Sequence, residues 1–198
     1  MGALLLAAGL SRRMGTSKLL EDWNGKPIIW HSASALIGVV DQVVVTLGAN
    51  AASIDAALPD DPLFETLMVP DYEEGMAASL RAGMAEAARR SWDGAFVMLG
   101  DMPLVPGPLL KAMRGSRWKG RSNVTIPVRH ERRGNPALWG ADHFAAFQTL
   151  RGEEGGRTLL ARRAIDWQPF EADTDAICFD VDTPEALERL RTMPAPRA

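Results

Sequence analysis

Three cationic side chains follow a short apolar run near the start of the chain. The stretch LLLAAGLSRRMGTSK contains Arg12, Arg13 and Lys18, and Gly9 and Gly15 flank the two arginines. Glycine lets the backbone turn its amide groups toward an anion, and each cation adds charge-assisted hydrogen bonds. Neither the Walker spacing nor the dinucleotide-binding glycine spacing occurs here. The loop therefore suits a polyphosphate, and a solvated turn is the alternative that the loop alone leaves open.

One carboxylate follows directly on a second apolar run, in the stretch VMLGDMPLV. Here Gly100 ends the run and Asp101 comes next. Mg²⁺ prefers one or two carboxylates together with substrate phosphates, so this position suits a metal ligand. The alternative is that Asp101 caps a helix that begins near Pro106.

Two more carboxylates lie close together in the stretch CFDVDTPEAL. Strand alternation places Asp180 and Asp182 on the same side of the chain. One of them can face Asp101 across the ligand edge of a sheet, while the other could cap the last helix. Because Thr183 and Glu185 can already serve the start of that helix, we expect Asp182 to be the second metal ligand.

A glycine precedes a helical pattern in the stretch DYEEGMAASLRAG. After Gly75 the first turn of such a helix exposes free N–H groups, and Ser79 offers a hydroxyl near that end. These groups suit a ribose or a base edge. An ordinary turn and an amphipathic helix are the alternative reading of the stretch.

The elements that must position these residues alternate along the chain. Apolar runs that suit buried strands lie at residues 3–8, 42–47, 65–69, 94–99 and 123–128. Helical spacing fills residues 25–36, 75–90 and 106–113. This alternation predicts an α/β fold with a parallel sheet and helices on both faces. Ligands of such sheets bind beyond the carboxyl ends of the strands, where the candidate residues lie.

The last third of the chain follows a different pattern. Residues 129–140 suggest a hairpin, residues 153–164 a loop and a short helix, and residues 179–191 a strand end capped into a final helix. The six tryptophans suit packing, and Trp139 in the hairpin is the one that could instead line a pocket for a ring. The length of 198 residues fits a single domain over residues 1–198.

Composition excludes several classes of protein. The net charge of −3 with 24% charged residues predicts no broad basic surface, and hence no nucleic-acid partner. The single cysteine, Cys178, cannot form an internal disulfide, and the three histidines show no metal-ligand spacing. No segment has the length of a membrane span, and the apolar start lacks the basic residues of a signal peptide. We therefore expect a cytoplasmic protein with no membrane partner.

Taken together, these stretches resemble the MobA-like nucleotidyltransferase family, and most closely its molybdenum cofactor cytidylyltransferase branch. The opening signature of the family is matched by Leu6, Ala7, Ala8, Gly9, Ser11, Arg13, Met14, Gly15 and Lys18. The stretches EGMAASLRAG, GDMP, GNPALW, GEEGGRTLL and DVDTPEAL resemble later blocks in the same order. The resemblance implies a three-layer Rossmann-like nucleotidyltransferase fold with a mostly parallel central sheet and a small hairpin lobe. It divides the chain into a nucleotide-binding half, 1–105, and an acceptor-binding half, 106–198.

The resemblance also assigns roles to residues. The expected nucleotide-binding residues are Leu6, Ala7, Ala8, Gly9, Arg13, Lys18, Gly75, Ser79, Gly100 and Asp101. The expected catalytic residues are Arg13, Lys18 and Asp101, and the expected ligands of Mg²⁺ are Asp101 and Asp182. The expected acceptor-binding residues are Met102, Pro103, Asn135 and Pro136.

The substrates follow from the same resemblance. Guanylyltransferases of the family typically have Ala-Gly-Gly in the opening loop, whereas this chain has Ala7, Ala8 and Gly9, so CTP is preferred to GTP. The expected acceptor is the phosphate of molybdopterin or molybdenum cofactor, and a molybdoenzyme would receive the product. Guanylyl transfer, and cytidylyl transfer to another small phosphate, remain as alternatives. Val69 and Glu153 depart from residues common in the branch and leave the sugar contact open.

Overall fold

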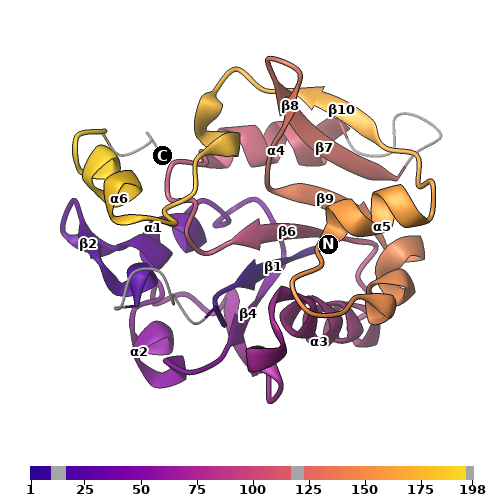
Figure 1. The fold of residues 1–198 in the computed structure, drawn as a ribbon, viewed down its shortest axis with the longest axis horizontal. Helices are drawn as coiled ribbons and strands as arrows, with labels where there is room; N and C mark the ends of the chain where they lie inside the picture. Colours follow the sequence, from indigo (N-terminus) through magenta and orange to yellow (C-terminus); the bar gives the residue numbers. More distant parts are fainter. Residues whose placement is uncertain (10–16, 117–122, 195–198) are drawn as a thin grey trace.

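The computed structural model describes residues 1–9, 17–116 and 123–194 of the chain. An eight-stranded mixed sheet runs through the middle of the described part (Figure 1). Its strands are β1 (Gly2–Leu6), β4 (Gln42–Leu47), β5 (Phe64–Met68), β6 (Gly94–Leu99), β7 (Val124–Arg129), β8 (Arg132–Arg133), β9 (Ala137–Gly140) and β10 (Gln168–Glu171). A separate two-stranded ribbon joins β2 (Asp22–Trp23) to β3 (Lys26–Pro27).

The sheet is mostly parallel. Its order is β10-β7-β9-β6-β1-β4-β5, with β8 paired to β7 outside this path. Strands β1, β4, β5 and β6 run parallel, and so do β7 and β10. Strand β9 pairs antiparallel with both β6 and β7 and so joins the two parallel halves. The carboxyl ends of β1 and β6 meet at one edge, since Leu6 pairs with Leu99.

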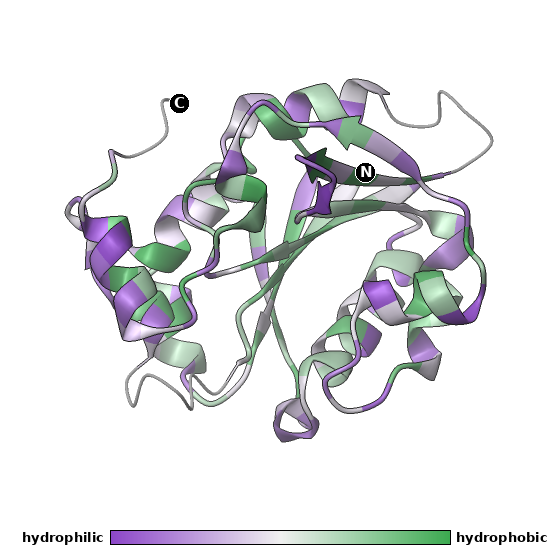
Figure 2. Ribbon diagram, turned by 45° about the horizontal axis from the view of Figure 1, so that its top comes forward, coloured by the Kyte–Doolittle hydropathy of each residue, from purple (hydrophilic) through white to green (hydrophobic). Residues whose placement is uncertain are grey.

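Helices cover both faces of the sheet. They are α1 (Ile28–Ser34), α2 (Ala51–Ala56), α3 (Met76–Arg89), α4 (Gly107–Ser116), α5 (Gly156–Arg162) and α6 (Pro184–Arg191). Short 3-10 segments are η1 (Lys18–Leu20), η2 (Tyr72–Glu74), η3 (Ala141–Thr149) and η4 (Asp175–Cys178). Residues from α1, α2 and α4 share one apolar cluster with the sheet, and residues from α3, η3 and α5 share another. The central strands are accordingly green in Figure 2, between helices that carry purple residues on their outer sides.

The two apolar clusters follow from alternation along the strands. In β1, Ala3 and Leu5 face the first cluster while Leu4 faces the second, and all three are fully buried. Strands buried on both faces read as continuous apolar runs, which is why the sequence revealed them. A third cluster packs α6 against the β2-β3 ribbon and α1 through Trp23, Ile28 and Val181.

Most of the predicted elements are confirmed. Runs predicted at 42–47 and 94–99 coincide with β4 and β6, and the predicted helices contain α1 and α3 and overlap α4. In the region of the hairpin predicted over 129–140, β8 pairs with β7 instead of β9, so the hairpin lies one strand earlier than expected. The final helix is α6, whose N-cap Thr183 accepts a hydrogen bond from Ala186 N–H at 3.2 Å. The three-layer α/β fold is therefore confirmed.

One predicted element is wrong. The strand end expected before α6 is irregular chain between η4 and α6. Its Val181 N–H donates to the backbone carbonyl of Asp101 at 3.0 Å, and the Val181 side chain is fully buried in the third cluster. The segment is thus fixed by the loop after β6 and by packing.

No helix in the described ranges has the length and apolar character needed to cross a membrane.

Candidate functional site

The loops after β1 and β6 form the floor of the candidate site. Gly100 N–H donates to the carbonyl of Leu6 at 3.0 Å, and Ser32 Oγ donates to the carbonyl of Gly100 at 2.8 Å. A Cβ at Gly100 would lie 2.8 Å from Ile29 Cδ1 and 3.0 Å from the Leu6 carbonyl oxygen. A larger residue would push the two loops apart, so glycine holds Asp101 close to the end of β1.

A second carboxylate reaches this floor from the far end of the chain. The hydrogen bond from Val181 N–H to the Asp101 carbonyl brings the segment before α6 against the loop after β6. Thr183 caps α6, so Asp182 is not the cap of that helix. This agrees with the hypothesis that Asp182 belongs to the site and does not serve as the helix cap.

Lys18 joins the two carboxylates. Its Nζ donates to Asp101 Oδ2 and, at 2.5 Å, to Asp182 Oδ1. The Lys18 and Asp101 side chains are 15% and 11% exposed, and the Asp182 side chain is 32% exposed. Three residues separated by more than eighty positions in the chain thus meet at one ammonium group.

The charges at this centre are unevenly balanced. Burial raises the pKa of Asp101 above its ordinary value, and the nearby charges of Asp182 and Asp180 raise it further, against the lowering effect of Lys18. Burial alone would lower the pKa of Lys18, but its attraction and hydrogen bonds to Asp101 and Asp182 raise it overall. Lys18 is therefore charged at neutral pH, and the ionised form of Asp101 needs more positive charge around it.

One oxygen of the centre is left without a partner. Asp101 Oδ1 is buried and accepts no hydrogen bond from any residue that the structure describes. A buried carboxylate oxygen without a partner carries a desolvation cost, and such orphans call for a ligand or a functional reason. The carboxylates of Asp101 and Asp182 both bind the Lys18 ammonium group, and Asp101 Oδ1 could accept a further cation.

A cavity lies beside this carboxylate centre. Its volume is about 460 Å³ and its lining comprises Met102, Arg132, Arg133, Asn135, Arg157, Ile177, Cys178 and Asp180. The structure therefore places Met102 and Asn135, two of the four predicted acceptor-binding residues, on one cavity. Pro103 and Pro136 are buried and do not line it. Sequence reasoning overlooked Arg133 and Arg157, although the cluster of arginines in the stretch RHERRGNP was a visible signal.

The expectation for the start of α3 needs a correction. The first N–H groups of α3 are occupied: Met76 N–H donates to Glu153 Oε2 at 3.3 Å, and Ala77 N–H donates to the Gly152 carbonyl at 2.9 Å. The loop before α5 folds over this helix end, and a Cβ at Gly75, whose φ is +108°, would lie 2.6 Å from the Gly152 oxygen. The proposed roles of Gly75 and of the buried Ser79 stay predictions.

The structure places two further expectations and leaves one open. Ala7 and Ala8 are buried at the end of β1, with Ala7 N–H donating to the Thr46 carbonyl at 3.1 Å. Arg13 lies outside the described residues. The interpretation of Trp139 as a pocket residue is wrong: it is 1% exposed and packs edge-on against Phe147, at 4.9 Å between ring centroids.

Comparison with known proteins adds a family to this geometry. The MobA-like NTP transferase domain matches residues 3–167, which include β1, β6, Lys18 and Asp101. Among solved structures, Rv0371c of Mycobacterium tuberculosis superposes with a TM-score of 0.85 at 26% identity and covers 97% of each chain.

Curated relatives carry several names. Nicotine blue oxidoreductase of Paenarthrobacter nicotinovorans is 31% identical over 195 residues and covers 94% of each chain. Molybdenum cofactor guanylyltransferase of Shewanella frigidimarina is 25% identical and covers 96% of this chain and 95% of its own. Molybdenum cofactor cytidylyltransferase of Escherichia coli is 22% identical and covers 92% and 91%.

Proposed function

Because this chain belongs to the MobA-like NTP transferase family and is a nucleotidyltransferase, we propose that it moves CMP from CTP to a molybdopterin-type phosphate and releases pyrophosphate. The observation that carries the proposal is the meeting of Lys18, Asp101 and Asp182 beside the end of β1. A cation and two carboxylates at the carboxyl edge of a parallel sheet suit a reaction between two phosphates.

The carboxylates fit a divalent cation, which we propose to be Mg²⁺. Asp101 Oδ1 has no hydrogen-bond partner in the described part of the chain, and Asp101 and Asp182 already converge on one positive charge. Hard cations prefer such oxygen ligands, and Mg²⁺ usually takes one or two carboxylates with substrate phosphates. When bound, the ion would neutralise charge that develops on the phosphates.

The reaction needs little proton chemistry. A phosphate monoester has a second pKa of about 6, so it is largely dianionic at neutral pH and needs no general base. One of its oxygens forms a bond to the α-phosphorus of CTP while the bond from that phosphorus to the pyrophosphate oxygen breaks. The electron pair leaves with pyrophosphate.

The protein must overcome the repulsion between two anions. The charged Lys18, held at the floor of the site, would stabilise the departing pyrophosphate, and we assign Arg13 to the same task. Asp101 and Asp182 would hold the cation, and the loops after β1 and β6 would fix the nucleotide relative to the acceptor.

CTP is proposed over GTP on the identity of residue 8. Guanylyltransferases of the family typically have Ala-Gly-Gly in the opening loop, whereas this chain has Ala7, Ala8 and Gly9, and the Ala8 side chain is buried. The relatives include one protein named for each nucleotide, so their names do not decide between CTP and GTP.

Pyrophosphate release measures the proposal directly. The purified chain is incubated with molybdopterin, Mg²⁺ and each of the four nucleoside triphosphates in turn. We expect release with CTP well above that with GTP, and CMP attached to the acceptor by mass. Equal or greater release with GTP would overturn the choice of CTP, and no release with any triphosphate would overturn the acceptor.

A one-residue change sharpens the choice of nucleotide. We expect Ala8→Gly to raise the GTP-to-CTP ratio of kcat/KM about tenfold, because one methyl group in a packed pocket discriminates on that order. Ala52→Gly, at an exposed position in the first turn of α2, is the matched control with an unchanged ratio. An unchanged ratio in Ala8→Gly would remove Ala8 from the selection of the base.

An oxidoreductase is the second candidate, favoured by the relative of that name in Paenarthrobacter nicotinovorans. The dinucleotide glycine pattern G-x-G-x-x-G does not occur in the opening loop of this sequence. Consumption of NADH or NADPH by the purified chain, with no pyrophosphate released in the assay above, would favour this candidate.

A further inference from the structure

The cavity beside the carboxylate centre, here named the arginine cavity, carries an unusual lining. Arg132, Arg133 and Arg157 contribute three guanidinium groups to a volume of about 460 Å³, and among the described residues Asp180 is the one acidic side chain that lines it. Asn135 adds an amide. The residues come from β8, the loop before β9, α5 and the segment after η4, so the cavity forms only in the folded chain.

The guanidinium groups are positioned but not neutralised. None of the three arginines forms an ion pair with a carboxylate in residues 1–9, 17–116 and 123–194. Arg133 lies over the ring of Trp167 at 4.4 Å, and Arg157 Nη2 donates to the backbone carbonyl of Arg133 at 2.9 Å. Stacking on an aromatic ring leaves the edge N–H groups of a guanidinium available to an anion.

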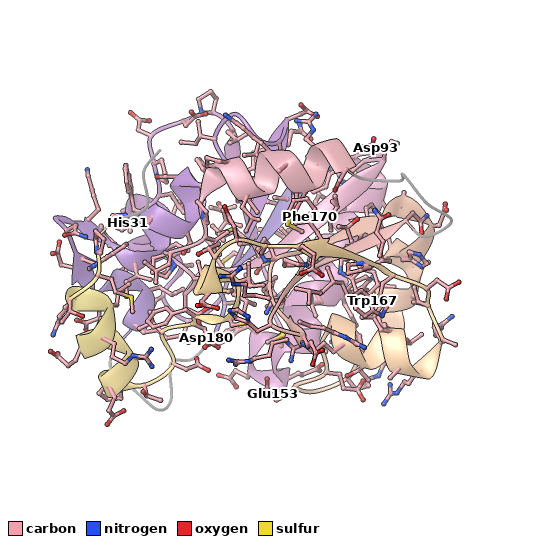
Figure 3. All side chains as sticks on the ribbon, turned by 90° about the horizontal axis from the view of Figure 1, so that it is seen from above. His31, Asp93, Glu153, Trp167, Phe170 and Asp180 are labelled. Atoms are coloured by element: carbon pink, nitrogen blue, oxygen red, sulfur yellow. The ribbon has the colours of Figure 1, made fainter. Side chains whose placement is uncertain are left out.

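The cavity adjoins the reaction centre. Two of its lining residues, Met102 and Asp180, come directly after Asp101 and two residues before Asp182, respectively. In Figure 3, Asp180 lies in the segment after η4 and Trp167 in the segment before β10. A molecule whose phosphate reaches the carboxylate centre can therefore extend into the arginine cavity.

We propose that the arginine cavity binds a second anionic group of the acceptor, separate from the phosphate that attacks the nucleotide. The inference rests on the proposed function and narrows its substrate class to phosphate monoesters that carry another anionic group. Molybdopterin belongs to this class, since it carries an ionisable dithiolene in addition to its phosphate. The three guanidinium groups supply forked donors that match an oxyanion or a dithiolate.

Steady-state kinetics test the role of the cavity. Arg133→Gln and Arg157→Gln are compared with the wild type and with Arg163→Gln, an exposed arginine just after α5 that does not line the cavity. We expect each cavity variant to raise KM for molybdopterin about tenfold or more, since each removes a hydrogen bond to a charged group. The KM for CTP, kcat and the melting temperature stay within error, as do all constants of Arg163→Gln.

A change confined to the KM for molybdopterin distinguishes a role in acceptor binding from a role in stabilising the fold. A rise in both KM values together with a lower melting temperature would indicate a structural role and overturn the proposal. A KM for molybdopterin that changes less than twofold in both cavity variants would overturn it as well. Arg157→Lys should recover part of the affinity that Arg157→Gln loses, because lysine restores the positive charge but not the paired N–H donors of a guanidinium.

A second measurement does not depend on the acceptor. The Nε–Hε resonances of the arginine side chains are recorded by NMR during a titration with inorganic phosphate and assigned from the same variants. We expect those of Arg133 and Arg157 to shift with saturation and that of Arg163 to stay in place. If the wild type transfers nothing to molybdopterin, the proposed function fails, while these shifts still support the cavity as an anion site. Unmoved resonances overturn the further inference whatever the acceptor.

Discussion

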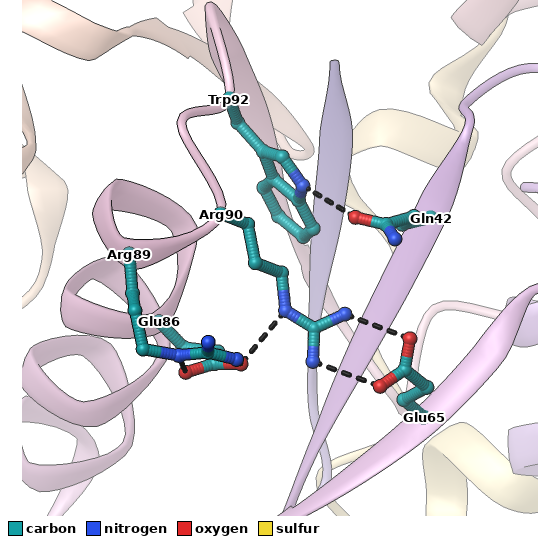
Figure 4. Close-up of polar contacts among 6 residues, drawn as sticks. All are labelled: Gln42, Glu65, Glu86, Arg89, Arg90 and Trp92. Carbon is teal, nitrogen blue, oxygen red and sulfur yellow. Dashed lines mark hydrogen bonds and ion pairs between the residues drawn. The ribbon is translucent and has the colours of Figure 1, made fainter.

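Among the places in this molecule that set one cation between two carboxylates, two do so in clearly different ways. In the site, Lys18 lies between Asp101 and Asp182. At the edge of the sheet, Arg90 lies between Glu65 and Glu86 (Figure 4). The first group joins loops at the carboxyl edge, and the second, which we name the Arg90 clamp, joins the end of α3 to β5.

The two places differ in how many of their carboxylate oxygens accept hydrogen bonds. Arg90 donates to both oxygens of Glu65, at 2.8 and 2.9 Å, and to Glu86 at 2.7 Å. Arg89 donates to the remaining oxygen of Glu86 at 2.7 Å. In the site, by contrast, Asp101 Oδ1 is buried without a partner among the described residues. All four carboxylate oxygens of the clamp thus accept hydrogen bonds, whereas one carboxylate oxygen of the site does not.

The shifts in pKa follow the same division. Hydrogen bonds from Arg89 and Arg90 lower the pKa of Glu86 to about 2, so its charged form is favoured by the fold. Burial raises the pKa of Asp101, so its charged form is disfavoured. The clamp stabilises the fold, whereas the site holds a carboxylate in a state that a bound cation would relieve.

The largest effect should come from Asp101→Asn. We expect nucleotidyl transfer to fall about a thousandfold, in line with the loss of one transition-state charge contact. The melting temperature should be unchanged or higher, because ionised Asp101 costs folding free energy above its ordinary pKa. Pyrophosphate release checks the expected loss of transfer, and thermal unfolding checks the expected melting temperature. Retained turnover or a lower melting temperature would contradict the view that Asp101, unlike the clamp residues, serves the reaction and not the stability of the fold.

Lys18→Met should have the next largest effect. We expect kcat to fall about a hundredfold, because the departing pyrophosphate loses a charged donor. Lys26→Met, in the β2-β3 ribbon, removes a lysine away from the carboxylates and serves as the control. Wild-type kcat in Lys18→Met would remove the lysine from the reaction.

Arg90→Met should lower stability and spare activity, the opposite of what we expect for the site variants. We expect the free energy of unfolding to fall by about 1 kcal/mol, because the clamp is only partly buried, and kcat to stay within twofold. Urea unfolding and pyrophosphate release on the same sample measure both. A larger loss of kcat than of stability would show that the clamp also supports the reaction.

The smallest effect is a dependence of stability on pH. Glu86 has a lowered pKa, so its stabilisation is fully present above an ordinary value of 4.5 and is lost as pH falls toward about 2. Glu86→Gln should therefore differ from the wild type in urea unfolding at pH 6 by a few tenths of a kcal/mol to about 1 kcal/mol, and the difference should shrink toward pH 3. A difference that stays constant over this range would assign it to packing.

The elements of the fold were largely predictable because strands buried on both faces leave uninterrupted apolar runs. Strands β4 and β6 coincide with such runs. The short edge strand β10 and the 3-10 segment η3 were not predicted, since their partly exposed residues leave no clear period. The irregular segment around Val181 was mistaken for a strand because its regular pattern of buried and exposed residues comes from packing against the Asp101 loop.

The candidate site was predictable only in part. Carboxyl-edge positions pointed to Asp101 and Lys18, and the cap at Thr183 pointed to Asp182. Sequence patterns do not show which residues more than eighty positions apart lie close in space. The contacts of Lys18 with both Asp101 and Asp182 are therefore seen only in the structure. The occupied end of α3 was also hidden, because the covering loop lies more than seventy residues away.

The hydrogen bond between Val181 and the Asp101 backbone has a consequence for biosynthesis. One of the two carboxylates, Asp182, comes more than eighty residues after the other, in a segment held at the sheet edge by that bond and by the packing of α6. A ribosome-bound chain can therefore complete β1, β4, β5 and β6 before Asp182 emerges. Competence for chemistry is then acquired after the central strands have formed, and fraying of α6 would silence the enzyme while leaving its central sheet intact.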